Sequence, residues 1–139
     1  MKSRIASGLT ILILGLLISL GPQFLFKPCG PVLAHDGAAA SWMKCHWSVR
    51  AEIGVGALAA ALGIGLLAFR SRDTRLGLWA GVFLSGVLAL LIPHVLIGGC
   101  AMATMPCQAL TFPALTLLGI LVALFSGGNL FFHFRRVRG

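Results

Sequence analysis

The chain of 139 residues has room for one domain, and its composition indicates a membrane protein. Hydrophobic residues make up 58% and charged residues 10%, with a mean hydropathy of +0.99, and a soluble domain of this size could not bury so much apolar surface. The net charge of +8 comes in short clusters beside apolar runs rather than along one continuous basic face, which argues against nucleic-acid binding.

Four apolar runs are each long enough to cross about 30 Å of hydrocarbon as a helix. We expect these helices at about residues 5–26, 49–69, 76–97 and 110–132, in a single transmembrane domain covering residues 1–139. The first run could also be the core of a cleaved signal peptide, but the matching cleavage site falls too late in the chain. The pattern therefore predicts an all-α fold, an integral membrane four-helix bundle.

The distribution of lysine and arginine predicts the orientation of the bundle. The chain has 11 of these residues. Eight lie at the termini or in the turn between the second and third runs: Lys2, Arg4, Arg70, Arg72, Arg75, Arg135, Arg136 and Arg138. The other three are Lys27, Lys44 and Arg50. Cytoplasmic segments are enriched in these residues, so we expect a multi-pass protein of a bacterial-type inner membrane with both termini cytoplasmic.

Small residues predict which helix faces approach closely, because lipid gives apolar side chains no drive to associate. The second run contains Gly54, Gly56, Ala59, Ala60, Gly63 and Gly65. The third repeats a small residue every four positions, at Gly77, Gly81, Ser85 and Ala89. Packing within the chain is favoured over a homodimer through one of these stripes. Trp47 and Trp79 are expected in the aromatic belts at the two membrane surfaces.

Two titratable residues and one proline mark the predicted spans. Pro93 lacks an N–H group and should kink the third helix or free a carbonyl. His94 is a candidate functional residue at membrane depth, or else an interfacial histidine bonded to a neighbouring carbonyl. Glu52 either complements the N-terminal dipole of the second helix, with Ser48 as N-cap, or faces the bundle interior as a polar ligand or proton carrier.

The four cysteines fall as one pair in each of the two connecting segments expected on the extracytoplasmic side. The first segment holds Cys29 and Cys45, and the second holds Cys100 and Cys107. Disulfides form and persist in such a compartment. Of the three pairings that four cysteines allow, proximity favours Cys29–Cys45 and Cys100–Cys107. Two disulfides that brace the outer face are one interpretation of this pattern.

Two other interpretations give the cysteines a chemical role. Four helices with a cysteine pair in each outer loop resemble the quinone-linked disulfide-forming membrane oxidoreductases and the vitamin K epoxide reductases. That resemblance implies thiol–disulfide exchange, although neither segment has the Cys-x-x-Cys pair of those families, so no catalytic residue is carried over. Alternatively, the segments hold a soft metal, because thiolate and thioether ligands favour Cu(I) and imidazole suits copper. The candidate metal ligands are Cys45, His46, Met102 and Met105.

The run Met43-Lys44-Cys45-His46-Trp47, followed by Glu52, resembles the signature of the domain-of-unknown-function 4418 family. Gly99-Cys100 and Met105-Pro106-Cys107 fit the same family. The resemblance implies a small four-helix bacterial membrane protein with no established activity, and it covers nearly the whole chain. The candidate functional cluster consists of Met43, Cys45, His46, Trp47, Glu52 and His94.

The sequence argues against a hydrolase or a stand-alone pump. It shows no nucleotide-binding loop, paired-carboxylate site or serine triad, and no charged pair within a span of the kind that ion-coupled transporters carry. We expect a non-enzymatic accessory or partner-binding subunit with a disulfide-braced outer face, in contact with the bilayer and with a membrane-protein partner or a second copy. The alternatives are an extracytoplasmic thiol–disulfide redox protein and a copper-type metal-handling protein. No cofactor is required, but copper or a quinone would suit these alternatives.

Overall fold

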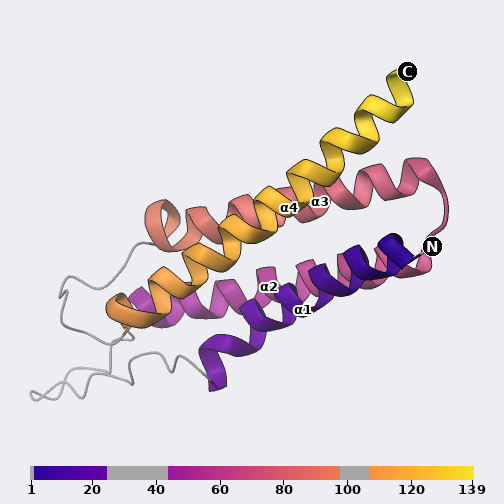
Figure 1. Cartoon of the computed structure of the whole chain (residues 1–139). Helices are drawn as coiled ribbons and strands as arrows, with labels where there is room; N and C mark the ends of the chain where they lie inside the picture. The colour runs from indigo at the N-terminus through magenta and orange to yellow at the C-terminus, as the bar shows by residue number, and fades with distance from the viewer. Residues whose placement is uncertain (1, 25–43, 98–106) are drawn as a thin grey trace, which may run out of the picture.

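A computed structural model of the chain describes residues 2–24, 44–97 and 107–139 (Figure 1). These residues form four long helices: α1 (Lys2–Phe24), α2 (Lys44–Ala68), α3 (Arg72–Leu91) and α4 (Phe112–Arg138). A π-helical turn, η1 (Ile92–Leu96), extends α3, and a second, η2 (Cys107–Thr111), leads into α4. The described part of the chain contains no strand, so the prediction of an all-α fold is confirmed.

The four helices are long and apolar enough to cross a membrane, over Ile5–Phe24, Trp47–Ala68, Arg72–Leu96 and Ala109–Arg136. Large apolar side chains such as Leu84, Leu124 and Phe132 are exposed on the outside of the bundle, as expected where lipid is the solvent. The protein is therefore a multi-pass membrane protein. α2 begins before the predicted residue 49 and α4 continues beyond the predicted residue 132, because hydropathy marks only the part of a helix that lies in hydrocarbon.

Helices α1 and α2 are in backbone contact along much of their length. A Cβ atom added to Gly15 would lie 2.5 Å from the backbone nitrogen of Ala60, and one added to Gly63 would lie 2.8 Å from that of Leu12. These glycines let the two backbones approach more closely than any side chain would permit. Gly56 and Gly63 of α2 take part as the sequence predicts, whereas Gly54 faces open space and Gly65 faces Leu78 of α3. Gly15 of α1 was not among the predicted contacts.

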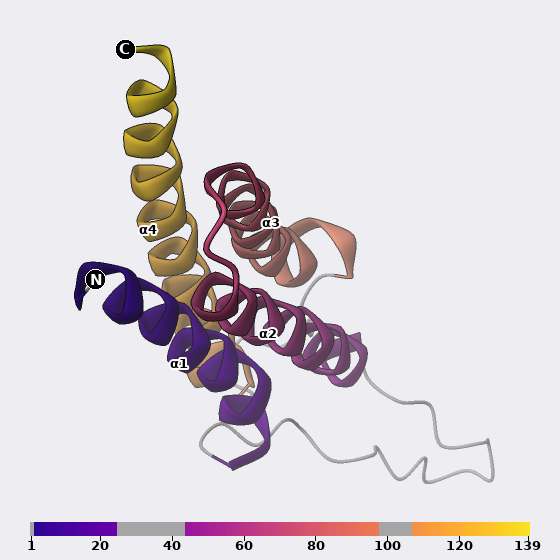
Figure 2. The ribbon, with the colours of Figure 1, turned by 90° about the vertical axis from the view of Figure 1, so that its right-hand side faces the viewer.

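Helices α3 and α4 form a second close pair. The closest approach is at Gly86, where an added Cβ would lie 2.9 Å from the backbone nitrogen of Ala123. The predicted stripe is therefore only partly an interface: Gly77 faces open space, and Gly81 faces the side chain of Leu62 in α2. Figure 2 shows the two pairs from one end of the bundle, with α2 and α3 joining them.

The centre of the bundle is a cluster of apolar side chains from all four helices, and Trp79 is its largest member. Trp79 is 0% exposed and packs against Phe125, with ring centroids 6.1 Å apart. The expectation that Trp79 lies in an interfacial belt is therefore wrong. Its position on α3 turns it toward α4, where a large aromatic ring fills the space between the helix pairs.

The α-helical hydrogen-bond ladder of α3 ends at Pro93, as predicted. A proline has no N–H group to donate to the carbonyl four residues earlier, so the turn from Ile92 to Leu96 is wider than an α-helical turn. It closes with a hydrogen bond of 3.0 Å from the backbone N–H of Ile97 to the carbonyl of Ile92. This wide turn sets the direction of His94.

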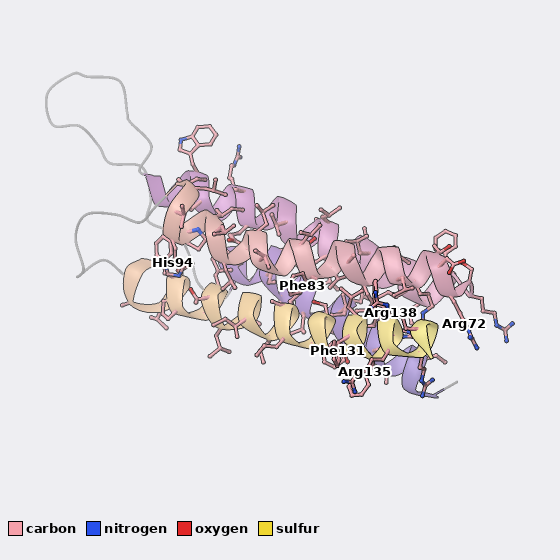
Figure 3. The ribbon with its side chains drawn as sticks, turned by 90° about the horizontal axis from the view of Figure 1, so that it is seen from above. Arg72, Phe83, His94, Phe131, Arg135 and Arg138 are labelled. Carbon is pink, nitrogen blue, oxygen red and sulfur yellow. The ribbon has the colours of Figure 1, made fainter. Side chains whose placement is uncertain are left out.

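The two ends of the bundle differ in charge. Both termini of the described chain and the turn between α2 and α3 lie toward one end of the bundle, called here the arginine end (residues 2–5, 69–75 and 135–139) (Figure 1). The opposite end, called here the loop end, holds residues 20–24, 44–52, 92–97 and 107–116. Figure 3 shows His94 at the loop end and Arg72, Arg135 and Arg138 at the arginine end.

Candidate functional site

Several predicted site residues lie outside the described part of the chain. These are Cys29, Met43, Cys100, Met102 and Met105. Cys45 and His46 lie in the first turn of α2, and Cys107 is the first residue of η2, but their side chains are not described. The disulfide pairings and the metal ligands therefore stay predictions. What can be placed is the backbone: α2 and η2 both begin at the loop end.

Glu52 lies in the interior of the bundle. Its side chain is 0% exposed, and neither carboxyl oxygen has a hydrogen-bond partner among the described residues. The alternative that Glu52 complements a helix N-terminus with Ser48 as N-cap is wrong, since α2 begins at Lys44 and Ser48 already lies within it. The helix starts earlier than its apolar run because the stretch Lys44–Arg50, which is too polar to be marked by hydropathy, is also helical.

One buried hydroxyl group, that of Ser48, lies about one helical turn from Glu52. Ser48 is buried four residues before it, on the same face of α2. Gly56 follows four residues later, and a Cβ added there would lie 2.5 Å from the backbone nitrogen of Ser19 in α1. Glu52 thus occupies a face of α2 that packs against α1. A carboxylate in this position has to be neutralised by a proton, a cation or a hydrogen-bond donor.

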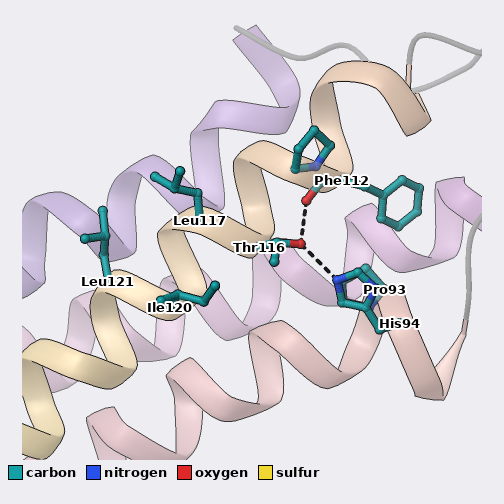
Figure 4. A pocket seen from close by; sticks show the side chains of 8 residues that line it. Pro93, His94, Phe112, Thr116, Leu117, Ile120 and Leu121 are labelled. Atoms are coloured by element: carbon teal, nitrogen blue, oxygen red, sulfur yellow. Dashed lines mark hydrogen bonds between the residues drawn. The ribbon is translucent and has the colours of Figure 1, made fainter.

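His94 is joined to Thr116 across the contact between η1 and α4 (Figure 4). The two atoms, His94 Nε2 and Thr116 Oγ1, lie 3.0 Å apart. The hydroxyl of Thr116 donates its only hydrogen to the backbone carbonyl of Phe112, at 2.7 Å. Nε2 must therefore be the donor to Thr116. Nδ1 has no hydrogen-bond partner among the described residues and can accept a hydrogen bond or bind a metal.

These residues lie beside a groove at the loop end, called here the histidine groove. Its volume is about 800 Å³. It is lined by Pro93, His94, Phe112, Pro113, Thr116, Leu117, Ile120 and Leu121 (Figure 4). Apolar side chains form most of the lining, and His94 and Thr116 supply the polar side chains. Such a groove suits an apolar ligand, or a helix of another protein, that carries one hydrogen-bonding group.

The placed members of the predicted cluster occupy different surroundings. Trp47 is 56% exposed at the loop end, as expected for an interfacial tryptophan. Glu52 is buried between helices, whereas His94 is exposed beside α4. Thr116 was not predicted, although a polar residue within the fourth apolar run is a visible signal. Only the pairing of η1 with α4 reveals that this hydroxyl accepts from His94.

One protein-family model matches a stretch of the chain that reaches from α1 to α4. The model of the family described as "Domain of unknown function (DUF4418)" matches residues 11–132, which include most of each of the four helices. No curated protein matches the chain, and no solved structure matches it. The match confirms the resemblance indicated by the run from Met43 to Trp47, and the description assigns no activity.

Proposed function

The chain belongs to the DUF4418 family, and we propose that it is a non-enzymatic membrane subunit that binds a transmembrane helix of a partner protein at its loop end. In this proposal both termini are cytoplasmic and the loop end faces outward, because arginines gather at the opposite end of the bundle. The partner helix lies in the histidine groove and presents a small polar donor to His94.

The observation that carries the proposal is the unused hydrogen-bonding capacity of His94. Its ring lies in an apolar groove that opens on the outside of the bundle, and only Nε2 is bonded within the described chain. Polar side chains facing lipid are costly, and hydrogen bonds between helices are a common way to satisfy them. A serine, threonine or asparagine on a partner helix would donate to Nδ1, while the apolar lining would pack against that helix.

The position of Glu52 is a second reason to propose that the binding region lies at the loop end. Two other buried polar side chains, Ser85 and Ser126, donate to a carbonyl of their own helix, and Ser126 donates to that of Val122 at 2.6 Å. The carboxyl group of Glu52 has no such bond among the described residues. We propose that a donor brought by the partner satisfies this group.

The cysteine pairs fit this proposal as braces. We propose that Cys29–Cys45 and Cys100–Cys107 are disulfides that hold the connecting segments close to the starts of α2 and η2. A segment restrained in this way loses less conformational entropy when it meets a partner. These disulfides would therefore strengthen binding without taking part in chemistry.

Site-specific photo-crosslinking in the membranes of the native host tests the proposed helix contact. A photoreactive amino acid at Leu117 lies in the histidine groove, whereas one at Leu124 lies seven residues on, on a similar face of α4 and outside that groove. Both positions are exposed, at 60% and 70%, so they are matched for contact with lipid. We expect one discrete protein adduct from position 117 only, and its loss in the variant His94→Leu.

Each other result of this experiment contradicts the proposal. Protein adducts of equal yield at both positions would indicate random collision in the membrane. An adduct that persists in His94→Leu would show that His94 does not recognise the partner. A small-molecule adduct at position 117 alone would indicate that the histidine groove holds a lipid-soluble ligand such as a quinone and not a partner helix.

A second candidate function rests on the backbone at the loop end, where α2 and η2 begin with the turns that hold Cys45, His46 and Cys107. Thiol–disulfide exchange or copper handling would need several sulfur or imidazole groups in one place, and these turns supply such groups at one end of the bundle. Thiol labelling of the unreduced, purified protein separates the candidates. Two structural disulfides leave no reactive thiol, whereas thiols that appear and vanish with quinone indicate redox exchange. Copper bound in stoichiometric amount and lost in Cys45→Ser indicates metal handling.

A further inference from the structure

A second groove, called here the arginine groove, lies at the opposite end of the bundle between α3 and α4. Its volume is about 720 Å³. Its lining includes Phe83 of α3 and Gly127, Leu130, Phe131, Arg135 and Arg138 of α4. Figure 3 shows Phe83 and Phe131 along this side of the bundle, with Arg135 and Arg138 near its end. The groove thus runs from an apolar region toward a basic one.

The absence of a side chain at Gly127 keeps the apolar part of the groove open. A Cβ atom added there would lie 3.4 Å from the ring of Phe83, an ordinary van der Waals contact. The neighbouring Gly128 faces open space, where an added Cβ meets nothing within 4 Å. Toward the C-terminus, α4 diverges from the other helices, so the groove is not closed by packing (Figures 1 and 2).

Arg135 and Arg138 give the basic part of the groove its positive charge, and no aspartate or glutamate among the described residues lines it. The guanidinium carbon of Arg135 lies 4.9 Å from the centre of the Phe131 ring, a cation–π contact that holds the side chain beside the groove. The described side chains of the arginine end include six arginines and one acidic residue, Asp73, which does not line the groove. Guanidinium groups bind phosphate oxygens through paired hydrogen bonds.

We propose that the arginine groove binds one anionic phospholipid. Its acyl chain lies against Phe83, Gly127 and Leu130, and its phosphate group contacts Arg135 and Arg138. Lipid fits both parts of the groove, because its charged group is at the membrane surface and its chain is at membrane depth. An acidic protein segment would match the arginines but not the apolar region that continues toward the bilayer interior. The site is distinct from the histidine groove and does not depend on the proposed partner or orientation.

Native mass spectrometry of the full-length protein released from nanodiscs tests this proposal. The nanodiscs contain equal amounts of phosphatidylglycerol and phosphatidylcholine, which differ in net charge. We expect the protein to retain one phosphatidylglycerol in preference to phosphatidylcholine. The double variant Arg135→Ala, Arg138→Ala should bind phosphatidylglycerol roughly tenfold or more weakly, since both phosphate contacts are lost. The matched control is Arg136→Ala, which removes a neighbouring charge that does not line the groove and should retain the lipid.

A second pair of variants tests the acyl part of the groove. Gly127→Leu fills the space beside Phe83 and should reduce lipid retention, while Gly128→Leu adds the same side chain in open space and should not. If the double arginine variant fails to fold, as judged by helical circular dichroism, this pair of variants still tests whether the groove binds lipid. Equal loss in Arg136→Ala, equal retention of both lipids, or no difference between the glycine variants would each overturn the proposal.

Discussion

His94 in the π-helical turn after α3 donates a hydrogen bond from Nε2 to the hydroxyl of Thr116 in α4, with the two atoms 3.0 Å apart. The direction of this bond follows from a second one, because the Thr116 hydroxyl gives its hydrogen to the carbonyl of Phe112. One side of the imidazole is thereby fixed to the bundle. The other side has no hydrogen-bond partner among the described residues, and for this reason we place His94 at the centre of the proposed contact.

Replacing Thr116 by valine, which has the same shape, removes the acceptor for His94. We expect the free energy of unfolding in detergent to fall by about 0.5–1.5 kcal/mol, the range of a hydrogen bond in a folded protein. The matched control is Thr10→Val, because the Thr10 hydroxyl also donates to the carbonyl four residues earlier, that of Ala6 at 2.8 Å, but forms no hydrogen bond to another helix among the described residues. Equal effects of the two variants would show that the bond between the helices contributes nothing.

The contact between α1 and α2 should be sensitive to a single methyl group. Gly56→Ala places a Cβ atom 2.5 Å from the backbone nitrogen of Ser19, so the helices must separate. We expect a loss of about 1–3 kcal/mol in the free energy of unfolding, as for an overpacked core. Gly54→Ala, two residues earlier in open space, should instead be neutral or stabilise the helix by about 0.5–1 kcal/mol. Chemical unfolding in mixed micelles measures both, and a harmless Gly56→Ala would contradict the close packing.

The buried carboxyl group of Glu52 should lower the free energy of unfolding of the isolated protein. Glu52→Leu replaces a buried carboxyl group, unpartnered among the described residues, by an apolar side chain of similar size, and we expect the free energy of unfolding to rise by about 1–3 kcal/mol. Glu52→Gln keeps a polar group that still needs partners, so its effect should be smaller. Thermal unfolding in detergent measures the three proteins side by side. A lower stability of Glu52→Leu would mean that a group outside the described residues already satisfies the carboxyl.

The orientation of the bundle is open to a direct test. The arginine end should be cytoplasmic, so a fluorescent protein fused after Gly139 should fold and emit, whereas alkaline phosphatase fused there should be inactive. The same fusions to a variant whose six described arginines at that end are replaced by glutamine provide the control for the role of charge. An active phosphatase fusion on the unaltered chain would place the termini outside and invert the topology.

The features that could be predicted from sequence are those set by one helix and its solvent. A helix that crosses hydrocarbon needs about twenty apolar residues, so the number and approximate place of the spans follow from hydropathy. The break at Pro93 follows from the missing N–H group of proline, whatever packs beside it. The prominence of His94 and Glu52 also follows locally, because a titratable residue in an apolar run is visible without any knowledge of the fold.

The packing of the helices could not be predicted in the same way. In a soluble bundle, polar and apolar faces of a helix differ, and their period indicates which side is buried. In lipid both faces are apolar, so hydropathy does not tell the buried Trp79 from the exposed Leu84. Small residues give only partial guidance: Gly56 and Gly63 do lie in a contact, but Gly77 faces open space.

Four membrane-spanning helices, a break at Pro93 and a titratable residue in each of two spans could thus be predicted from the chain alone. The enclosure of Glu52 between helices, the bond from His94 to Thr116 and the grooves near the two ends of α4 became visible once the packing was known. The reason is physical. Solvent and backbone chemistry act on each residue through its own segment, whereas a hydrogen bond or a groove between helices depends on which faces of two segments meet.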